Sequence, residues 1–123
     1  MREQDLGIKP EQILPVVEGM TFNATTSELM VDGQAITRFS RVQGSALKAL
    51  LEHPDTLLSY ENMYHLVYPY YQDRMCLENE RIVQQTVSRL RRGLEMIDPQ
   101  FAEHVQTFKV RGYRWNTNLP ETK

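Results

Sequence analysis

The clearest hydrophobic pattern in the chain lies in residues 80–98, where apolar side chains recur at alternating steps of four and three. At 100° per residue these positions fall within about 80° of arc, which is the apolar stripe of an amphipathic helix. Asp98-Pro99 ends the predicted helix. The stripe consists of Val83, Val87, Leu90, Leu94 and Ile97. The opposite side carries Arg81, Gln84, Gln85, Ser88, Arg89, Arg91 and Arg92.

Two shorter helices are predicted before it. The first covers residues 39–53, with Ser40 as its N-cap and Pro54 as its stop. The second follows Ser59, which is also a suitable N-cap, and ends at Pro69. The expected buried positions are Phe39, Val42, Ala46, Leu47, Leu50 and Leu51 in the first helix, and Met63, Leu66 and Val67 in the second.

Short β-like runs lie on both sides of the helical region. Residues 20–23, 27–33 and 34–38 are typical of strands, and Asp32-Gly33 favours a hairpin because glycine adopts a positive φ without a Cβ penalty. Residues 105–116 contain two more runs around a V-R-G connection and predict a basic hairpin. The element order predicts an α+β fold with a small N-terminal antiparallel sheet, three helices and a C-terminal hairpin.

These elements divide the chain into one domain and two flanking segments. The predicted domain covers residues 19–117, and a chain of 123 residues suits one domain with a modest core. Residues 1–18 contain two prolines and no sustained period, so we interpret them as a loose arm. Residues 118–123 are a tail, and residues 70–79 are an irregular connection before the long helix.

Composition excludes several classes of protein. Hydrophobic residues make up 41% and charged residues 24%, as in globular rather than disordered chains. No apolar run is long enough to cross a membrane, signal-peptide features are missing, and the single Cys76 leaves no disulfide framework. We therefore expect a cytoplasmic setting and no membrane contact within this chain. No metal-ligand spacing, phosphate loop or catalytic motif occurs, so we expect no metal, no cofactor and no enzymatic activity.

Charge is distributed unevenly along the chain. The net charge is −2, but residues 79–114 hold seven basic and four acidic side chains, whereas the remainder holds seven basic and twelve acidic ones. A helix face of Arg and Gln with few acids suits the major groove of DNA, because Arg pairs with guanine, Gln pairs with adenine, and both bind phosphate. The alternative at this point is an ordinary amphipathic helix with solvated charges.

Three segments carry a family resemblance: 50-LLEHPDTLLSYENM-63, 81-RIVQQTVSRLRRGLE-95 and 107-TFKVRGYRW-115. In this order and at this spacing, they resemble the effector domain of OmpR/PhoB-type winged-helix transcription regulators. The resemblance implies a winged helix-turn-helix in which residues 80–98 enter the major groove and residues 105–116 form a wing at the adjacent minor groove. It therefore implies a sequence-specific transcription regulator whose partner is double-stranded DNA.

The resemblance also implies roles for single residues. Arg89 matches the family's base-reading arginine, and Gln85 lies one turn earlier on the same face. Phosphate contacts are implied for Arg81, Ser88, Arg91 and Thr107, and minor-groove contacts for Lys109 and Arg111. Gln84 and Arg92 complete the expected DNA-binding set.

Some positions depart from the family pattern. Gln84 stands where an acid is usual, Ser88 stands at a common basic or polar contact position, and Val110 stands where many members have glycine. The wing is closest to the ToxR/CadC branch. These differences leave DNA binding as the expectation and leave the bound sequence open.

The resemblance implies further partners. About 18 residues precede the first predicted strand, too few for a receiver domain, so we expect either a stand-alone regulator or the cytoplasmic domain of a membrane-tethered ToxR-like activator, anchored beyond Lys123. Residues 70–79 are the expected contact with RNA polymerase, and two copies are expected on tandem or inverted half-sites. The rival hypothesis is a winged-helix protein-interaction module that does not bind DNA specifically.

Overall fold

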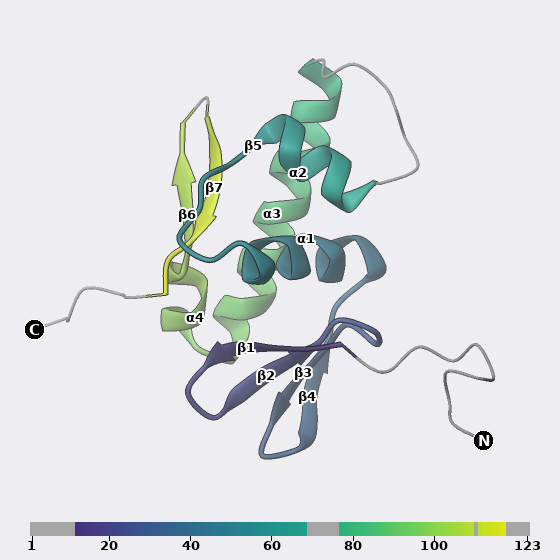
Figure 1. The fold of residues 1–123 in the computed structure, drawn as a ribbon, viewed down its shortest axis with the longest axis vertical. Helices are drawn as coiled ribbons and strands as arrows, with labels where there is room; N and C mark the ends of the chain where they lie inside the picture. Colours follow the sequence, from purple (N-terminus) through teal and green to yellow (C-terminus); the bar gives the residue numbers. More distant parts are fainter. Residues whose placement is uncertain (1–11, 69–76, 110, 118–123) are drawn as a thin grey trace, which may run out of the picture.

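The computed structural model describes residues 12–68, 77–109 and 111–117. It has an α+β architecture, in which a four-stranded sheet lies at one end, helices form the middle, and a β-hairpin stands beside them (Figure 1). This arrangement confirms the fold class predicted from the sequence. The predicted tail at 118–123 and most of the predicted arm lie outside the described residues.

The N-terminal sheet contains four antiparallel strands, in the order in which they occur along the chain. They are β1 (Ile13–Val17), β2 (Met20–Asn23), β3 (Glu28–Val31) and β4 (Gln34–Arg38). The last three confirm the strands predicted from the sequence. Asp32 and Gly33 between β3 and β4 have φ angles of 52° and 80°, as a two-residue hairpin turn requires.

Strand β1 corrects the prediction of a loose arm over residues 1–18. Its alternation is obscured by Pro15, which normally argues against a strand because proline cannot donate to the ladder. Here β1 is the edge strand, and its register shifts between Pro15 and Val17, so the proline is tolerated. The sheet, and with it the domain, therefore begins before residue 19.

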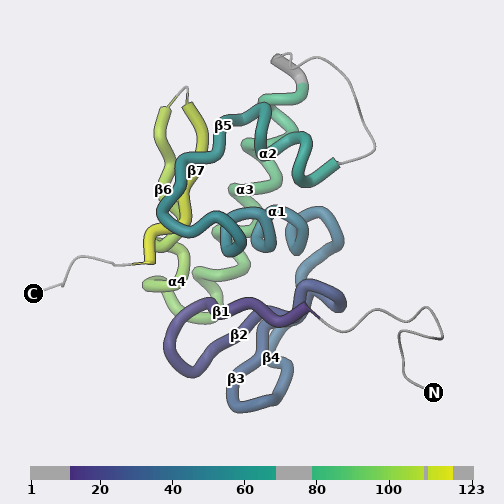
Figure 2. The backbone as a smooth tube through the Cα atoms, viewed as in Figure 1, coloured from purple at the N-terminus to yellow at the C-terminus, as the bar shows by residue number. Residues whose placement is uncertain are grey.

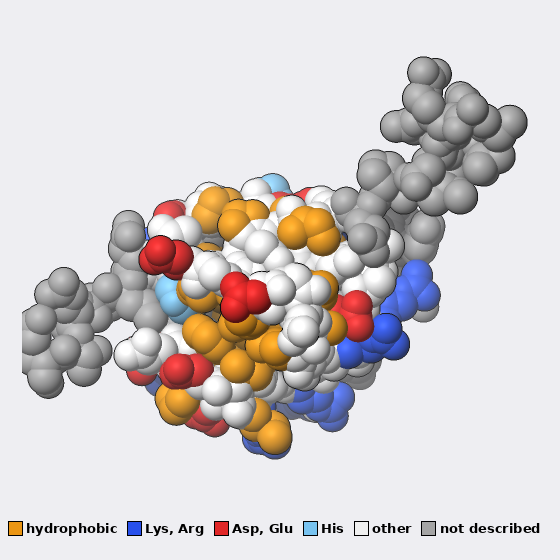
Figure 3. Space-filling model, turned by 90° about the horizontal axis from the view of Figure 1, so that it is seen from below, with side chains coloured by type: hydrophobic (Ala, Val, Ile, Leu, Met, Phe, Trp, Pro, Cys, Tyr) orange, Lys and Arg blue, Asp and Glu red, His pale blue; other side chains and the backbone are white. Residues whose placement is uncertain are grey.

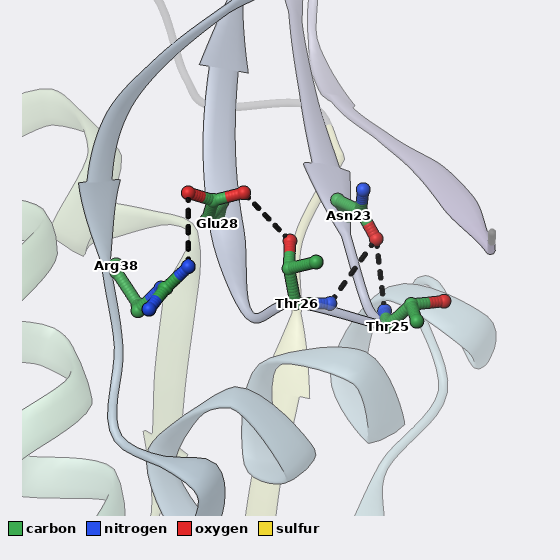
Figure 4. Close-up of polar contacts among 5 residues, drawn as sticks. All are labelled: Asn23, Thr25, Thr26, Glu28 and Arg38. Atoms are coloured by element: carbon green, nitrogen blue, oxygen red, sulfur yellow. Dashed lines mark hydrogen bonds and ion pairs between the residues drawn. The ribbon is translucent and has the colours of Figure 1, made fainter.

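Polar contacts fix the turn between β2 and β3 (Figure 4). Asn23 Oδ1 accepts hydrogen bonds from the backbone N–H groups of Thr25, at 2.9 Å, and Thr26, at 3.2 Å. The Thr26 hydroxyl donates to Glu28, which also pairs with Arg38 at 3.4 Å. An Asn side chain that binds the backbone two residues on is a local substitute for a backbone turn. The turn is thus held from within β2 and from β3.

Two capped helices follow the sheet. Helix α1 (Arg41–Glu52) begins after Ser40, whose hydroxyl accepts from Gln43 N at 3.2 Å. Helix α2 (Tyr60–Val67) begins after Ser59, whose hydroxyl accepts from Asn62 N at 3.0 Å. Both predicted N-caps are confirmed. The predicted burial of Met63 and Val67 is confirmed, whereas that of Leu66 is wrong, since it is 41% exposed; α2 buries Tyr60 and Tyr64 in addition.

The long helix α3 (Leu77–Ile97) starts three residues before the predicted position and ends as expected. A short helix that was not predicted, α4 (Pro99–Glu103), follows directly. Asp98 is its N-cap, with the carboxylate accepting from Gln100 N at 2.9 Å, and proline occupies its first turn. The Asp98-Pro99 pair thus ends one helix and begins another.

The wing consists of β6 (Val105–Phe108) and β7 (Gly112–Trp115), which confirm the predicted hairpin. A two-residue strand, β5 (Leu58–Ser59), pairs with β7 and makes the sheet order β5-β7-β6. A Cβ atom at Gly112 would lie 1.9 Å from the Leu58 carbonyl oxygen, and its φ is 150°. Only glycine lets β5 and β7 approach this closely.

One hydrophobic core joins the sheet, the helices and the wing. Helix α1 crosses α3 and contacts it, and α2 packs on both (Figure 2). The four predicted α3 positions Val83, Val87, Leu90 and Leu94 are buried, and Ile97 packs against the core while partly exposed. The largest fully buried side chains are Trp115, Phe22, Leu29, Leu47, Leu50, Met63, Leu90, Leu94 and Val87. This core fixes the outward face of α3.

Candidate nucleic-acid interface

The outward face of α3 presents a row of long polar side chains. Six residues line one open depression of about 320 Å³ along the helix. They are Arg81, Gln84, Gln85, Ser88, Arg89 and Arg92, and all six are exposed. The structure therefore brings together six of the seven α3 residues that the sequence predicted as a binding face.

The arginines on this face are available to a ligand. Within the described part of the chain, the side chains of Arg81, Arg89 and Arg92 make no hydrogen bond or ion pair. Glu95 is the only acid from Arg81 to Ile97. Surface arginines that form no ion pair attract anions, and a guanidinium can bind phosphate or guanine in a bidentate manner.

Arg91 differs from these three residues. Its side chain is half-buried, and Nη2 donates to the Val105 carbonyl oxygen at 2.9 Å and to Thr107 Oγ1 at 2.5 Å. It therefore joins α3 to strand β6 instead of extending into solvent. The structure brings Arg91 and Thr107 together, although the family resemblance implied a separate phosphate contact for each.

The wing carries a second group of cations. Lys109 and Arg111 lie exposed in the turn between β6 and β7, and their side chains form no bond with any other described residue. Val110 between them lies outside the described residues. The turn thus presents two cations at the end of a hairpin that stands beside α3 (Figure 1).

Arg114 in β7 was counted as a basic residue in the sequence but not as part of the site. Its Nε and Nη2 atoms donate to Gln106 Oε1 at 3.1 and 2.6 Å, and its guanidinium lies 5.1 Å from the Phe108 ring centroid. Gln106 is its direct partner across the hairpin. Arg114 therefore supports the wing, and the cross-strand spacing is the sequence signal for this contact.

The predicted protein contact at residues 70–79 is largely outside the described residues. Residues 70–76 are not described, and Leu77, Glu78 and Asn79 form the start of α3. The contact with RNA polymerase stays a prediction.

Figure 3 shows one face of the molecule, seen from below. Several Lys and Arg side chains lie at one side and along the lower edge of this face, and acidic side chains lie beside them as well as over the middle and the opposite side (Figure 3). This face therefore carries charges of both signs.

The whole arrangement is that of a known protein family. Residues 33–115 match the family described as "Transcriptional regulatory protein, C terminal". The chain belongs to this family. It is a DNA-binding domain of the OmpR/PhoB type, as found in transcription regulators, and neither this family nor this fold is that of an enzyme.

A relative and several solved structures resemble this family member. The "Transcriptional regulatory protein YvrH" of Bacillus subtilis is 32% identical over 105 residues, which cover 84% of this chain and 40% of the relative. The chain thus spans about two fifths of that relative's length.

None of the helices in the part that the structure describes is long and apolar enough to cross a membrane.

The similar structures support the winged-helix fold. The DNA-binding domain of Escherichia coli CadC has a TM-score of 0.67 at 18% identity and covers 86% of this chain and 94% of its own. The DNA-binding domain of the response regulator AdeR, solved in complex with an intercistronic region, has a TM-score of 0.61 at 15% identity. That match covers 81% of this chain and 95% of AdeR's domain.

Proposed function

We propose that this domain binds specific DNA sequences to regulate transcription, with α3 in the major groove and the β6–β7 wing at the adjacent minor groove. The observation that carries the proposal is the line of exposed Arg and Gln side chains on α3, which have no acidic partner in the described chain. A surface helix of this kind fits the width of the major groove. The similar fold of the AdeR DNA-binding domain, which was solved in complex with an intercistronic region, supports DNA as the partner.

The residues divide into base-reading and backbone-binding groups. Arg89 and Gln85 are four residues apart on one face, so both side chains can reach base edges of neighbouring pairs. Arg89 suits guanine and Gln85 suits adenine, because each offers paired hydrogen bonds to that base. Of the four other exposed residues, Arg81, Ser88 and Arg92 suit phosphates on either side of the groove, and Gln84 lies beside Gln85 on the same face.

Lys109 and Arg111 extend the interface to the minor groove. Their position in the wing turn keeps both charges clear of the core. Cations placed there add affinity that depends on salt more than on sequence. One domain of this size buries little DNA surface, so we propose two copies on tandem or inverted half-sites about one helical turn apart.

The domain's place in a longer protein is a separate proposal. A segment anchored in the inner membrane beyond Lys123 would hold the DNA-binding face in the cytoplasm, as in a ToxR-like activator. A stand-alone regulator would use the same face. Reading the coding sequence beyond Lys123 for about 20 consecutive apolar residues distinguishes the two.

Three single substitutions test the DNA-binding proposal by fluorescence anisotropy on a selected operator and on scrambled DNA. Arg89→Ala should cost about 1–3 kcal/mol on the operator and reduce discrimination, because a base contact is lost. Lys109→Ala should weaken binding to both DNAs alike. Arg41→Ala is the matched control, since Arg41 is exposed at the start of α1, outside the α3 face, and should change nothing.

A simpler measurement separates DNA binding from a protein-interaction module. A DNA-binding domain should stay on heparin at low salt and elute as salt rises, since polyanion binding releases counterions. Flow-through of the wild-type protein, together with unchanged anisotropy in the Arg89→Ala and Lys109→Ala variants, would contradict DNA binding and favour the protein-interaction hypothesis.

A further inference from the structure

Arg91 connects the candidate recognition helix to the wing. Its Nη2 atom donates to the Val105 carbonyl oxygen at 2.9 Å and to Thr107 Oγ1 at 2.5 Å, both in β6. Arg91 follows Arg89 by two residues, which places it about 200° further around the helix axis. The two arginines therefore leave α3 on opposite flanks, and Arg91 leaves it on the side of the wing.

The packing of the wing makes this connection important. In the described part of the chain, the backbone of the β6–β7 hairpin lies near α1, α2 and α4, and each of these helices packs on α3. The wing is thus joined to α3 through these neighbouring helices, and Arg91 adds a direct side-chain link between α3 and β6. Arg91 provides two hydrogen bonds at this junction, and its charge makes them stronger than bonds between neutral groups.

The second wing strand, β7, also lies within reach of the Arg91 charge. The Arg91 charge lies close enough to Tyr113 in β7 to lower the pKa of that phenol, against the stronger upward effect of its burial. The Tyr113 ring packs edge-on against Tyr60, the first residue of α2, with centroids 5.6 Å apart. Arg91 thus bonds to β6 and lies near Tyr113 of β7, which in turn packs on α2.

We propose that Arg91 is a positioning residue, which holds the wing in register with α3 so that Lys109 and Arg111 reach DNA together with Arg89. This inference rests on the proposed function and changes the role implied for two residues. Thr107 accepts a hydrogen bond from Arg91, so the two act as one link between helix and wing. Loss of either one should act through the wing cations and should not remove an independent phosphate contact.

A double-mutant cycle distinguishes positioning from direct contact. In the wild-type background, Lys109→Ala should weaken binding roughly threefold to tenfold, as the loss of one cation at the DNA does. In an Arg91→Met background, Lys109→Ala should leave the dissociation constant for DNA nearly unchanged, because the wing is no longer held against the DNA. If Lys109→Ala weakens DNA binding by the same factor in both backgrounds, the proposal is overturned and Arg91 is an independent contact.

Arg92→Met is the matched control, because Arg92 is the next residue, carries the same charge and makes no bond within the described chain. In the Arg92→Met background, Lys109→Ala should weaken DNA binding by the same factor as in the wild-type background. Thr107→Val removes the hydrogen-bond acceptor but keeps the Arg91 charge. In this background, as in Arg91→Met, Lys109→Ala should weaken DNA binding less than it does in the wild type. Each variant is first checked for the wild-type circular dichroism spectrum.

Hydrogen exchange tests the link without DNA. Backbone amides of β6 and β7 should exchange at least several times faster in Arg91→Met than in Arg92→Met, while those of β2 and β3 should be unchanged. If the wild-type protein binds no DNA, the proposed function fails and the positioning role in DNA binding fails with it, although faster exchange would still establish the link. If the wild-type protein binds DNA but Arg91→Met changes neither the exchange rates of β6 and β7 nor the effect of Lys109→Ala, only this inference fails.

Discussion

The imidazole of His104 lies flat against the indole of Trp115, with ring centroids 4.9 Å apart and planes 9° apart. The His104 Nδ1–H group donates to the Asn116 carbonyl oxygen at 2.6 Å, and Asn116 N donates back to the His104 carbonyl at 2.7 Å. Trp115 is one of the fully buried side chains of the core. The residue that ends α4 thereby anchors the base of the wing.

Substitutions at His104 separate the ring contact from the hydrogen bond. His104→Phe keeps an aromatic ring on Trp115 and should cost about 1–2 kcal/mol through the lost hydrogen bond. His104→Ala loses both and leaves a cavity, so it should cost about 2–4 kcal/mol. Urea unfolding measures both variants, and equal losses would show that the ring contact contributes nothing.

Gly112 is the position where a single methyl group should damage the wing most. Gly112→Ala would place Cβ 1.9 Å from the Leu58 carbonyl oxygen, so β5 and β7 must separate. We expect a loss of about 3 kcal/mol or more in the free energy of unfolding. Gly33→Ala is the control, because its φ of 80° is also positive and unfavourable for alanine but its Cβ meets nothing within 4 Å. Its cost should be about 1 kcal/mol, and a similar loss for both variants would contradict the steric argument.

Asp55 ties the loop after α1 to the chain that follows the wing. Its carboxylate accepts from the Thr117 hydroxyl at 2.6 Å and from Thr117 N at 3.0 Å. These bonds hold the pKa of Asp55 below its ordinary value of 3.8. A lowered pKa stabilises the fold above the unfolded value, and this contribution is lost as the pH falls through the folded value.

Asp55→Asn should therefore reduce stability at neutral pH, and the difference from wild type should shrink below about pH 4. Asparagine is the suitable replacement because the φ of residue 55 is 57°, which asparagine tolerates. Urea unfolding between pH 7 and pH 3 gives the difference. A gap that stays constant down to pH 3 would mean that the carboxylate charge has no part in the contact.

The sequence predicts the outward face of α3 well because one buried stripe decides it. Five apolar positions at helical spacing fix the helix rotation, and the face with Arg89 must then be outside. The role of Arg91 could not be predicted in this way. It lies among the same polar residues, and its partner Val105 is fourteen positions away in a strand whose placement depends on the whole core.

The missed elements have equally local reasons. Strand β1 contains Pro15, which weakens any strand prediction, and β5 has only two residues, too few for a period. Leu66 and Tyr64 are both plausible core residues at helical spacing, and only the packing of α2 on its neighbouring elements decides that Tyr64 is buried. Short or proline-containing elements and the choice between neighbouring apolar residues thus depend on tertiary contacts.

Ionisation of Tyr113 in β7 should reduce the stability of the fold at alkaline pH. Burial, with a smaller contribution from Tyr60, raises the pKa of Tyr113 from its ordinary value of 10.0 to about 12. The neutral phenol is favoured in the folded state, so its contribution is complete below pH 10 and is lost as the pH rises from 10 to 12. The loss amounts to about 2–3 kcal/mol for a shift of this size.

The Tyr113→Phe variant has no phenol that can ionise at this position, so its free energy of unfolding should fall less than that of the wild type. Urea unfolding at pH 9 to 12 measures the difference. Parallel losses in both proteins would show that Tyr113 ionises as easily in the folded state as in the unfolded one.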